Sequence, residues 1–287
     1  MKKKQWLLGM MLAGMLALCG CGNSSNDTQM QTNDSDVVQT SVQPVSTENE
    51  KETAQNPEAE ETPKPTPTPN PRAQYTVVID AGHQKKANTK LEPIGPGADE
   101  KKPKVASGTQ GVSTGIPEYK INLQVALKLQ KELEAKGYQV VMIRTTHNVD
   151  ISNKERAKIA NKSGDIFIRL HCDSVTDASV EGVLAVCPTA NNPYRIGKLF
   201  GECEELSYAI LSRVCDKTGA KNRGVLKTDY MSGINYCKIP VTIIEMGCMS
   251  NPAEDVRLSK KSYQKKIVKG ISKGIDDYFG IKKKRKK

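Results

Sequence analysis

Short apolar runs alternate with longer stretches of helical periodicity between residues 76 and 279, and this alternation constrains the fold more than any other feature. Runs of four to six residues rich in Val and Ile are typical of buried strands, whereas apolar residues at intervals of three and four are typical of helices. Strands are predicted at 76–79, 139–143, 165–170, 182–186 and 241–245, and helices at 118–135, 152–161, 202–217 and 262–279. Strands and helices in alternation favour a mostly parallel sheet. We therefore expect α/β architecture, a single three-layer domain over residues 75–281 with helices flanking the sheet.

Two of these helices carry sequence signals at their ends. Gly137 follows the helix at 118–135, and a glycine just past the last periodic residue commonly ends a helix. Ser152 stands before the next helix with Glu155 three residues later, which is the pattern of a capping box. These signals place two helix boundaries independently of the apolar pattern.

Side chains suited to metal binding or proton transfer follow three of the predicted strands. His83 comes after the first strand, His171 directly follows 165–170, and Glu245 ends the strand at 241–245. Sites in open α/β sheets form outside the carboxyl ends of the strands, so these three residues are expected at one edge of the sheet. Glu118, at the start of a helix, could add a fourth group to the same rim.

Each of these residues also has a plain structural explanation. A carboxylate such as Glu118 in the first turn is favoured by the helix dipole alone. His83 could be a hydrogen-bonded core histidine, although its position in a glycine turn favours a functional role. His147, the third histidine of the chain, is interpreted as a solvated loop residue. The argument for a site therefore depends on the combination of residues.

The N-terminal residues 1–20 resemble a bacterial lipoprotein signal peptide. Three lysines precede an apolar stretch from Trp6 to Leu18, which is too short for a stable membrane span. The sequence Leu18-Cys19-Gly20-Cys21 then resembles a lipobox, which predicts lipidation of Cys21. Cys19 fits less well because bulky Leu18 precedes it. The alternative is an ordinary secretory signal with two incidental cysteines.

Residues 21–74 are rich in Pro, Ser, Thr, Gln and Glu and contain nine acidic against three basic residues. Such a segment cannot bury enough apolar surface to fold, so we expect a disordered spacer between a membrane anchor and the domain. The chain as a whole carries a formal charge of +11, and residues 282–287 form a basic tail. A basic exported domain suits anionic wall polymers or lipid headgroups, and the export signal disfavours nucleic acid, so we expect no nucleic-acid partner. We expect a monomer on the outer face of the cell membrane.

Six cysteines lie in the predicted domain, without the C-x-x-C spacing of a zinc knuckle. Some could pair outside the cell, and others could be small buried apolar residues. The sequence leaves their pairing open.

The segments VVIDAGH, FIRLHCDS and IPVTIIEMGCMSNP, together with the helix that begins at Glu118, resemble the zinc-dependent N-acetylmuramoyl-L-alanine amidases of the amidase-3 type. The resemblance covers about residues 75–278, with the segments in the same order. It implies one zinc ion held by His83, Glu118 and His171, and catalysis by Glu245. The substrate it implies is peptidoglycan, cleaved at the amide between the lactyl group of N-acetylmuramic acid and L-alanine.

The sequence departs from the family's pattern at two places. Cys248 replaces the family's Phe after Gly247, and Cys172-Asp173 stand where Ala-Asn is commoner. Neither change removes an implied ligand. The segment 84–115 between two ligands is expected to be a long loop at the rim of the cleft, of undetermined role.

Two other functions stay open. A zinc carboxypeptidase or another cell-wall peptidase could use the same two histidines and glutamate, since the ligands do not select the substrate. A non-catalytic wall-binding lipoprotein is the alternative from a different class, although pure binding would not need Glu245. Release of new amino groups on L-alanine would identify the amidase.

Overall fold

The computed structural model describes residues 69–281. The elements follow one another in the order β1 (Thr76–Ala81), β2 (Asn88–Pro93), β3 (Lys101–Val105), α1 (Glu118–Lys136), β4 (Gln139–Met142), α2 (Asn153–Ser163), β5 (Ile166–Asp173), β6 (Val183–Cys187), the 3-10 helix η1 (Arg195–Leu199), α3 (Phe200–Thr218), β7 (Asn222–Lys227), α4 (Ser232–Asn235), β8 (Val241–Cys248), α5 (Pro252–Ser259) and α6 (Lys261–Tyr278).

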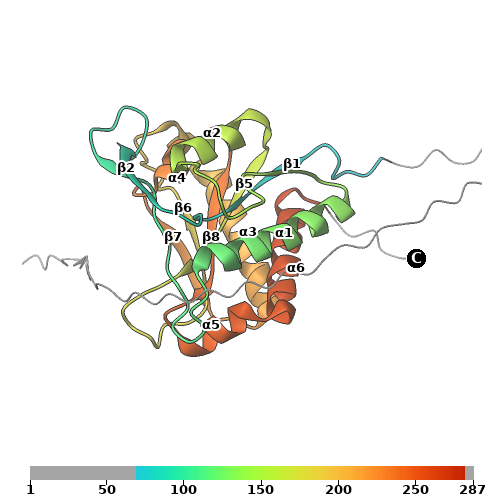
Figure 1. Cartoon of the computed structure of the whole chain (residues 1–287). Helices are drawn as coiled ribbons and strands as arrows, with labels where there is room; N and C mark the ends of the chain where they lie inside the picture. Colours follow the sequence, from blue (N-terminus) through green and yellow to red (C-terminus); the bar gives the residue numbers. More distant parts are fainter. Residues whose placement is uncertain (1–68, 282–287) are drawn as a thin grey trace, which may run out of the picture. The chain divides into compact units, whose positions relative to one another are not determined.

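Six strands form one sheet in the order β4-β1-β5-β8-β6-β7, and β2 and β3 form a separate two-stranded sheet. Within the large sheet every neighbouring pair is parallel except β6 and β8. The expected α/β fold with a mostly parallel sheet is therefore confirmed. Figure 1 shows helices on both sides of this sheet, with α2 above it and α1, α3 and α6 below in that view.

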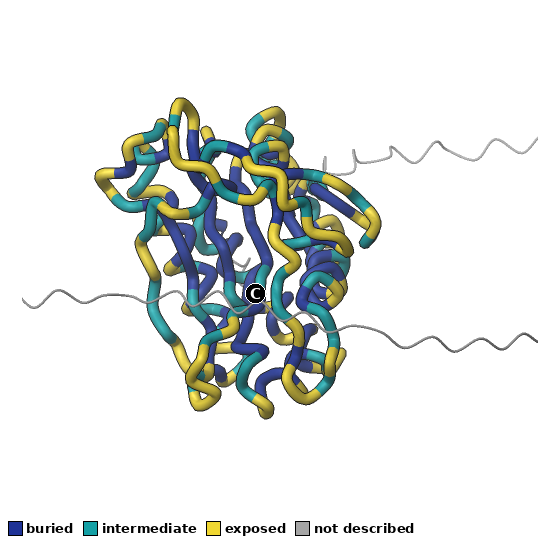
Figure 2. Tube along the Cα trace, turned by 60° about the vertical axis from the view of Figure 1, so that its left-hand side comes forward, coloured by how far each residue is buried: buried dark blue, intermediate teal, exposed yellow. Residues whose placement is uncertain are grey.

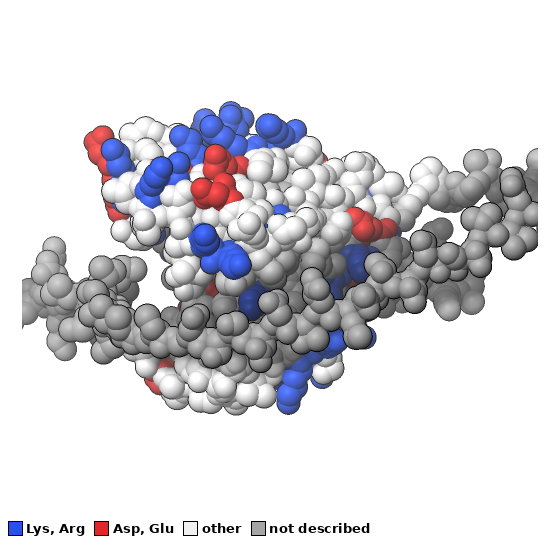
Figure 3. Space-filling view, viewed as in Figure 1, with Lys and Arg blue, Asp and Glu red and all other residues white. Residues whose placement is uncertain are grey.

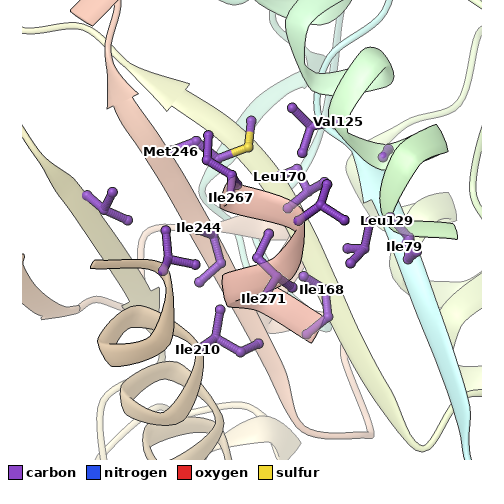
Figure 4. Close-up of a cluster of buried hydrophobic side chains, with 14 of the residues drawn as sticks. Ile79, Val125, Leu129, Ile168, Leu170, Ile210, Ile244, Met246, Ile267 and Ile271 are labelled. Carbon is purple, nitrogen blue, oxygen red and sulfur yellow. The ribbon is translucent and has the colours of Figure 1, made fainter. Parts of the chain in front are cut away.

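The sheet separates two hydrophobic clusters. In β1, Val77 and Ile79 belong to the cluster shared with α1, α3 and α6, whereas Val78 belongs to the cluster shared with α2, η1 and α4. This alternation is what a pleated strand buried on both faces requires. Figure 4 shows the first cluster, in which Leu129 of α1 and Ile271 of α6 lie among the strand side chains. In Figure 2 the buried residues run through the centre of the domain, and the loops at its two ends are exposed.

Helices α3 and α6 pack closely because two glycines of α6 meet the backbone of α3. A Cβ atom at Gly270 would lie 2.6 Å from the Cα of Val214, and one at Gly274 would lie 2.5 Å from the Cα of Ile210. Any larger side chain at either position would push the helices apart. The spacing of four residues places both glycines on one face of α6.

Residues 70–74 contact the domain before β1 begins. The Nε of Arg72 lies 2.9 Å from Asp276 of α6, whose carboxylate also accepts hydrogen bonds from Lys136 and Tyr138. Burial opposes ionisation of Asp276, but hydrogen bonds from Arg72 and Lys136 outweigh it and lower the pKa of this carboxylate. The packed part of the chain thus includes residues just ahead of the predicted domain start at 75.

The helix boundaries predicted from sequence signals are confirmed. Gly137 ends α1 in the left-handed conformation at φ 94°, and its N–H donates to the last carbonyls of the helix. Ser152 and Glu155 form the reciprocal hydrogen bonds of a capping box at the start of α2. Gly219 ends α3 in the same left-handed manner as Gly137.

The prediction of a long loop at 84–115 was wrong in part, because β2 and β3 form a hairpin within it. Their sequences, NTKLEP and KKPKV, lack alternating apolar residues, and Pro103 lies inside β3. The hairpin is mostly exposed, so it leaves no burial pattern in the sequence. The sequence analysis also did not predict four other elements. Three of them, η1, α4 and α5, are short, and the fourth, β7, lies at the edge of the sheet.

The predicted signal peptide, Cys21, most of the spacer and the basic tail 282–287 lie outside the described residues. Within residues 69–281, no helix combines the length and apolar character needed to cross a membrane. The six cysteines of this range are unpaired, and all except half-buried Cys215 are buried. Burial raises the pKa of Cys237 and Cys203, to about 12 for Cys203, so these thiols behave as small apolar side chains.

Candidate metal centre and active site

His171 and Glu245 lie side by side on one face of the sheet. They are direct partners in the register of β5 and β8. The pleat turns them toward the same side as Arg169 and Ile243, while Leu170 and Ile244 point into the opposite cluster. Both strands continue three residues beyond their predicted ends at 170 and 245, so His171 and Glu245 both lie within the strands, near their carboxyl ends.

His83 reaches the same place from the turn after β1. Its φ of 59° makes it the only non-glycine residue in the left-handed region among residues 69–281. Such backbone strain persists where the surrounding structure holds it and clusters at functional sites. Gly82 precedes it, and a Cβ there would lie 2.3 Å from the His171 ring, so only glycine lets the two histidines approach. The imidazole rings meet edge-on with their centroids 4.8 Å apart.

Glu118 lies between the two histidines at the first position of α1. Its Oε2 is 3.2 Å from Nε2 of His83, and its Oε1 is 3.2 Å from Nδ1 of His171. One ligand atom from each of these three residues falls within 4.8 Å of the others. The structure thus brings together the three residues that the sequence predicted as metal ligands.

Further hydrogen bonds fix the orientation of this carboxylate and of one imidazole. Glu118 accepts from the side chain of Asn122 at 3.0 Å, the N–H of Cys172 at 3.1 Å and the N–H of Thr109 at 3.0 Å. Nδ1 of His83 lies 2.9 Å from the carbonyl of Ala106. A histidine held in this way at one nitrogen presents the other to a metal, which is the usual support for a ligating histidine.

The cluster favours the protonation states that a metal requires. Burial opposes ionisation of Glu118, but hydrogen bonds from His171 and His83 outweigh it and hold its pKa well below the usual value. Burial lowers the pKa of His171 to about 4, against the opposing hydrogen bond from Glu118. A charged carboxylate and a neutral imidazole are the forms that bind metal ions.

The residues present fit a zinc ion. Two imidazoles and one carboxylate are a donor set of catalytic zinc, which keeps a position for substrate or water. Nε2 of His83 and Nδ1 of His171 each lie 3.2 Å from an oxygen of Glu118, so these are the atoms that could reach one ion together.

Glu245 stands beside this cluster without belonging to it. It is half-buried, and its Oε2 is a buried atom with no hydrogen-bond partner among residues 69–281. Burial and the nearby charges of Glu118 and Asp173 raise the pKa of Glu245 well above the usual value. A carboxyl group in this setting is suited to taking up and releasing a proton.

A cavity of about 270 Å³ opens against His83, His171 and Glu245. Its walls come from β3 and from the start of α4, and its floor comes from β5 and β8. Substrate-sized groups can therefore reach the face of the cluster.

His147 takes no part in this cluster. It lies in a loop, as predicted, but it is half-buried rather than solvated. Its ring packs edge-on against Tyr119, with the centroids 5.2 Å apart.

A buried ion-pair network beneath the site was missed at the sequence level. Asp80 of β1 pairs with Arg156 of α2 at 2.5 Å and with Arg169 of β5 at 2.9 Å, and all three side chains are almost wholly buried. It ties β1, which leads into the turn of His83, to β5, which carries His171. A charged residue inside an apolar strand, as in VVID and FIRL, was the available signal.

The loop before α1 is held by a second buried acid, Asp255 of α5. Its carboxylate accepts hydrogen bonds from the N–H of Ser113 at 2.8 Å and from the N–H and hydroxyl of Thr114 at 2.7 and 2.8 Å. A Cβ at Gly111 would lie 1.9 Å from the same carboxylate. The loop leads into Glu118, so α5 helps to set the position of a predicted ligand.

The model of the Amidase_3 family, N-acetylmuramoyl-L-alanine amidase, matches residues 77–277. The chain belongs to this family. The match covers all four predicted site residues and every element from β1 to α6, so the amidase resemblance seen in the sequence is confirmed over the whole domain. Membership supports amidase action on peptidoglycan.

Curated proteins and solved amidase structures show the same similarity. The uncharacterized protein YqiI of Bacillus subtilis is 27% identical over 205 residues, covering 71% of this chain and 84% of YqiI. The N-acetylmuramoyl-L-alanine amidase LytC of the same organism is 23% identical over 168 residues, and the match spans only 32% of its length. The crystal structure of the amidase Ami1 from Mycobacterium smegmatis superposes with a TM-score of 0.66 at 22% identity, over 74% of this chain and 99% of Ami1.

Proposed function

We propose that this amidase holds one zinc ion with His83, Glu118 and His171 and uses Glu245 as its proton-transfer group. The reaction is hydrolysis of the amide between the lactyl group of N-acetylmuramic acid and L-alanine of the stem peptide. The observation that carries the proposal is the convergence of the three donors within 4.8 Å of one another, next to a half-buried Glu245 with a free oxygen.

When bound, zinc supplies a Lewis acid that polarises the scissile carbonyl and lowers the pKa of water to about 7. Glu245 accepts the proton of the attacking water at Oε2 and returns it to the nitrogen of the leaving L-alanine. The residues of β3 and α4 that line the cavity would flank a substrate bound there.

A zinc peptidase remains the second enzymatic candidate, because the same donor set hydrolyses peptide bonds. Family membership favours the amidase, since the matching model describes N-acetylmuramoyl-L-alanine amidases. The two reactions differ in their products. An amidase frees the amino group of L-alanine, whereas a carboxypeptidase shortens the stem from its other end.

We also propose that Cys21 carries a lipid anchor and that residues 21–74 are a spacer, which places the enzyme in the wall next to the outer face of the membrane. The signal-like sequence and lipobox support this location. Lys and Arg side chains gather along the upper edge of the domain in Figure 3, where α2 lies in Figure 1. Such a surface suits anionic wall polymers, and we propose that the protein acts as a monomer.

Mass spectrometry of muropeptides tests the proposed reaction. Purified walls are digested with the full-length mature protein, with a chelator, and with the chelator followed by excess zinc. We expect intact stem peptides with free L-alanine amino termini, loss of this product with chelator and its return with zinc. Stems shortened at their carboxyl end would show a peptidase instead. Release of L-alanine amino termini in the presence of chelator would contradict the proposed dependence on zinc.

A further inference from the structure

The cavity at the site extends away from the metal-ligand cluster toward two basic residues. Arg169 of β5 and Lys102 of β3 line it together with Glu245, and Gly233 of α4 lines it next to Arg169. Neither basic residue belongs to the proposed metal or proton-transfer groups. Their surroundings show what this end of the cavity is suited to bind.

The guanidinium of Arg169 is buried but only partly used. Its Nε donates to Asp80 at 2.9 Å and its Nη2 donates to Asn153 at 2.7 Å, while Nη1 has no hydrogen-bond partner among the described residues. The side chain is 4% exposed. A Cβ at Gly233 would lie 1.8 Å from Nη1, so glycine at this position leaves the room that the guanidinium occupies. Nη1 is thus a free donor of a residue that lines the cavity, which favours an acceptor inside it.

The charges below the cavity do not balance. Asp80 is shared by Arg156 and Arg169, so one carboxylate faces two guanidinium groups. Glu245 lines the same cavity and interacts electrostatically with Arg169, although no hydrogen bond joins the two side chains. The lining therefore holds two basic residues, Arg169 and Lys102, against one acidic residue, Glu245.

Lys102 adds a second cation from the hairpin. Its Nζ donates to the carbonyl of Tyr230 at 2.9 Å and lies 3.9 Å from the centroid of the Tyr230 ring. No carboxylate of residues 69–281 pairs with it, although Glu100 lies close enough to act on its charge. Burial lowers the pKa of Lys102, which shows that its ammonium is partly withdrawn from water. An ammonium with one oxygen partner keeps donors for a ligand.

We propose that Arg169 and Lys102 form a subsite for a carboxylate of the stem peptide. The inference rests on the proposed amidase function and concerns the substrate that this site prefers. The second residue of a stem is a D-glutamyl unit linked through its side chain, which leaves its α-carboxylate free two residues from the scissile amide. Some walls carry the amide of this group instead. The subsite predicts preference for the free carboxylate, since a charged acceptor binds such donors more strongly than a neutral amide.

The carboxyl terminus of the stem offers the same chemistry, so the test separates the two sources. Four muramoyl tripeptides are compared. They have either a D-glutamyl or a D-isoglutaminyl second residue, and each form has either a free or an amidated carboxyl terminus. The readouts are KM and kcat/KM for release of L-alanine amino termini by the full-length zinc-loaded protein. We expect the D-glutamyl substrates to react at least about tenfold faster by kcat/KM, whatever the terminus.

Variants identify the groups that carry the preference. Lys102→Met should reduce the preference for D-glutamyl substrates to below about threefold, mainly through KM. Arg169→Lys, which keeps a positive charge beside Asp80, should reduce this preference as well. Lys101→Met is the matched control, because Lys101 is exposed on the neighbouring position of β3 and does not line the cavity. It should keep the full preference. Thermal unfolding of each variant checks that it folds.

Three outcomes would overturn the subsite. One is equal cleavage of the D-glutamyl and D-isoglutaminyl substrates by the wild-type protein. Another is an unchanged preference in the folded Lys102→Met variant, and the last is a preference set only by the carboxyl terminus. In each case the proposed amidase function stands, because cleavage is observed. Failure of the wild-type protein to cleave any of the four substrates would overturn both proposals.

Discussion

Replacement of Asp80 by Asn should destabilise the domain more than any other single loss of charge. Asp80 is fully buried and bridges Arg156 and Arg169, at 2.5 and 2.9 Å. The amide keeps the shape of the side chain but leaves both guanidinium groups in the interior without a counter-charge. Breaking a buried ion pair in this way costs about 3–5 kcal/mol, because the remaining charge stays desolvated.

Urea unfolding at pH 7 measures this loss as the difference in the free energy of unfolding between the variant and the wild-type protein. Asp216→Asn is the matched control, since Asp216 is 56% exposed and pairs with Arg213 on the surface at 3.1 Å. Exposed pairs contribute about 0–1 kcal/mol, so this variant should unfold almost like the wild type. A loss below about 1 kcal/mol for Asp80→Asn would refute the claim that this network holds β1, β5 and α2 together.

Three further predictions concern the site and the acid stability. Gly82→Ala should weaken zinc binding, measured by calorimetry, at least about tenfold, because its Cβ would lie 2.3 Å from the His171 ring. The control variant Gly201→Ala, which has open space around the new Cβ, should bind zinc like the wild type. Asp255→Asn should lower the free energy of unfolding in urea by about 2–4 kcal/mol, because the Asp255 carboxylate accepts three hydrogen bonds from the loop. An unchanged free energy of unfolding would contradict the role of Asp255 in holding the loop. The pKa of Asp276 is lower in the folded than in the unfolded protein, where it is about 3.9. The ionised carboxylate therefore stabilises the fold above about pH 3.9, and this contribution is lost as the pH falls through the pKa of the folded state. The melting temperature of Asp276→Asn should therefore fall less than that of the wild type below about pH 5, and parallel curves would contradict this.

The strands and helices that build the core could be predicted because burial imposes a period on their sequences. β1, β5 and β8 are largely apolar on both faces, as expected for strands covered on both sides. The hairpin of β2 and β3 could not be predicted, since it is largely exposed and its lysine-rich sequence carries no such period. The edge strand β7 escaped for a similar reason, and Gly224 at φ 85° interrupts its pattern.

The candidate site was predictable in its members but not in its supports. His83, His171 and Glu245 each follow an apolar run, and the rule for open sheets places them at one edge. Only the resemblance assigned Glu118 to the metal, because a glutamate in a first helical turn has an ordinary explanation. Asp255 is remote in sequence from the loop it holds, so no local pattern could reveal this contact.

Glu245→Gln provides the most direct test of the central claim. The variant keeps the size of the side chain but cannot take a proton from water, and none of the three proposed zinc ligands is changed. We expect the purified protein to bind one equivalent of zinc with the affinity of the wild type, while the release of L-alanine amino termini from purified walls falls by about 10²–10⁴-fold. His171→Ala is the companion variant, which should lose both zinc and activity. Full activity of Glu245→Gln, or loss of zinc from it, would contradict the separate roles assigned to the glutamate and the three ligands.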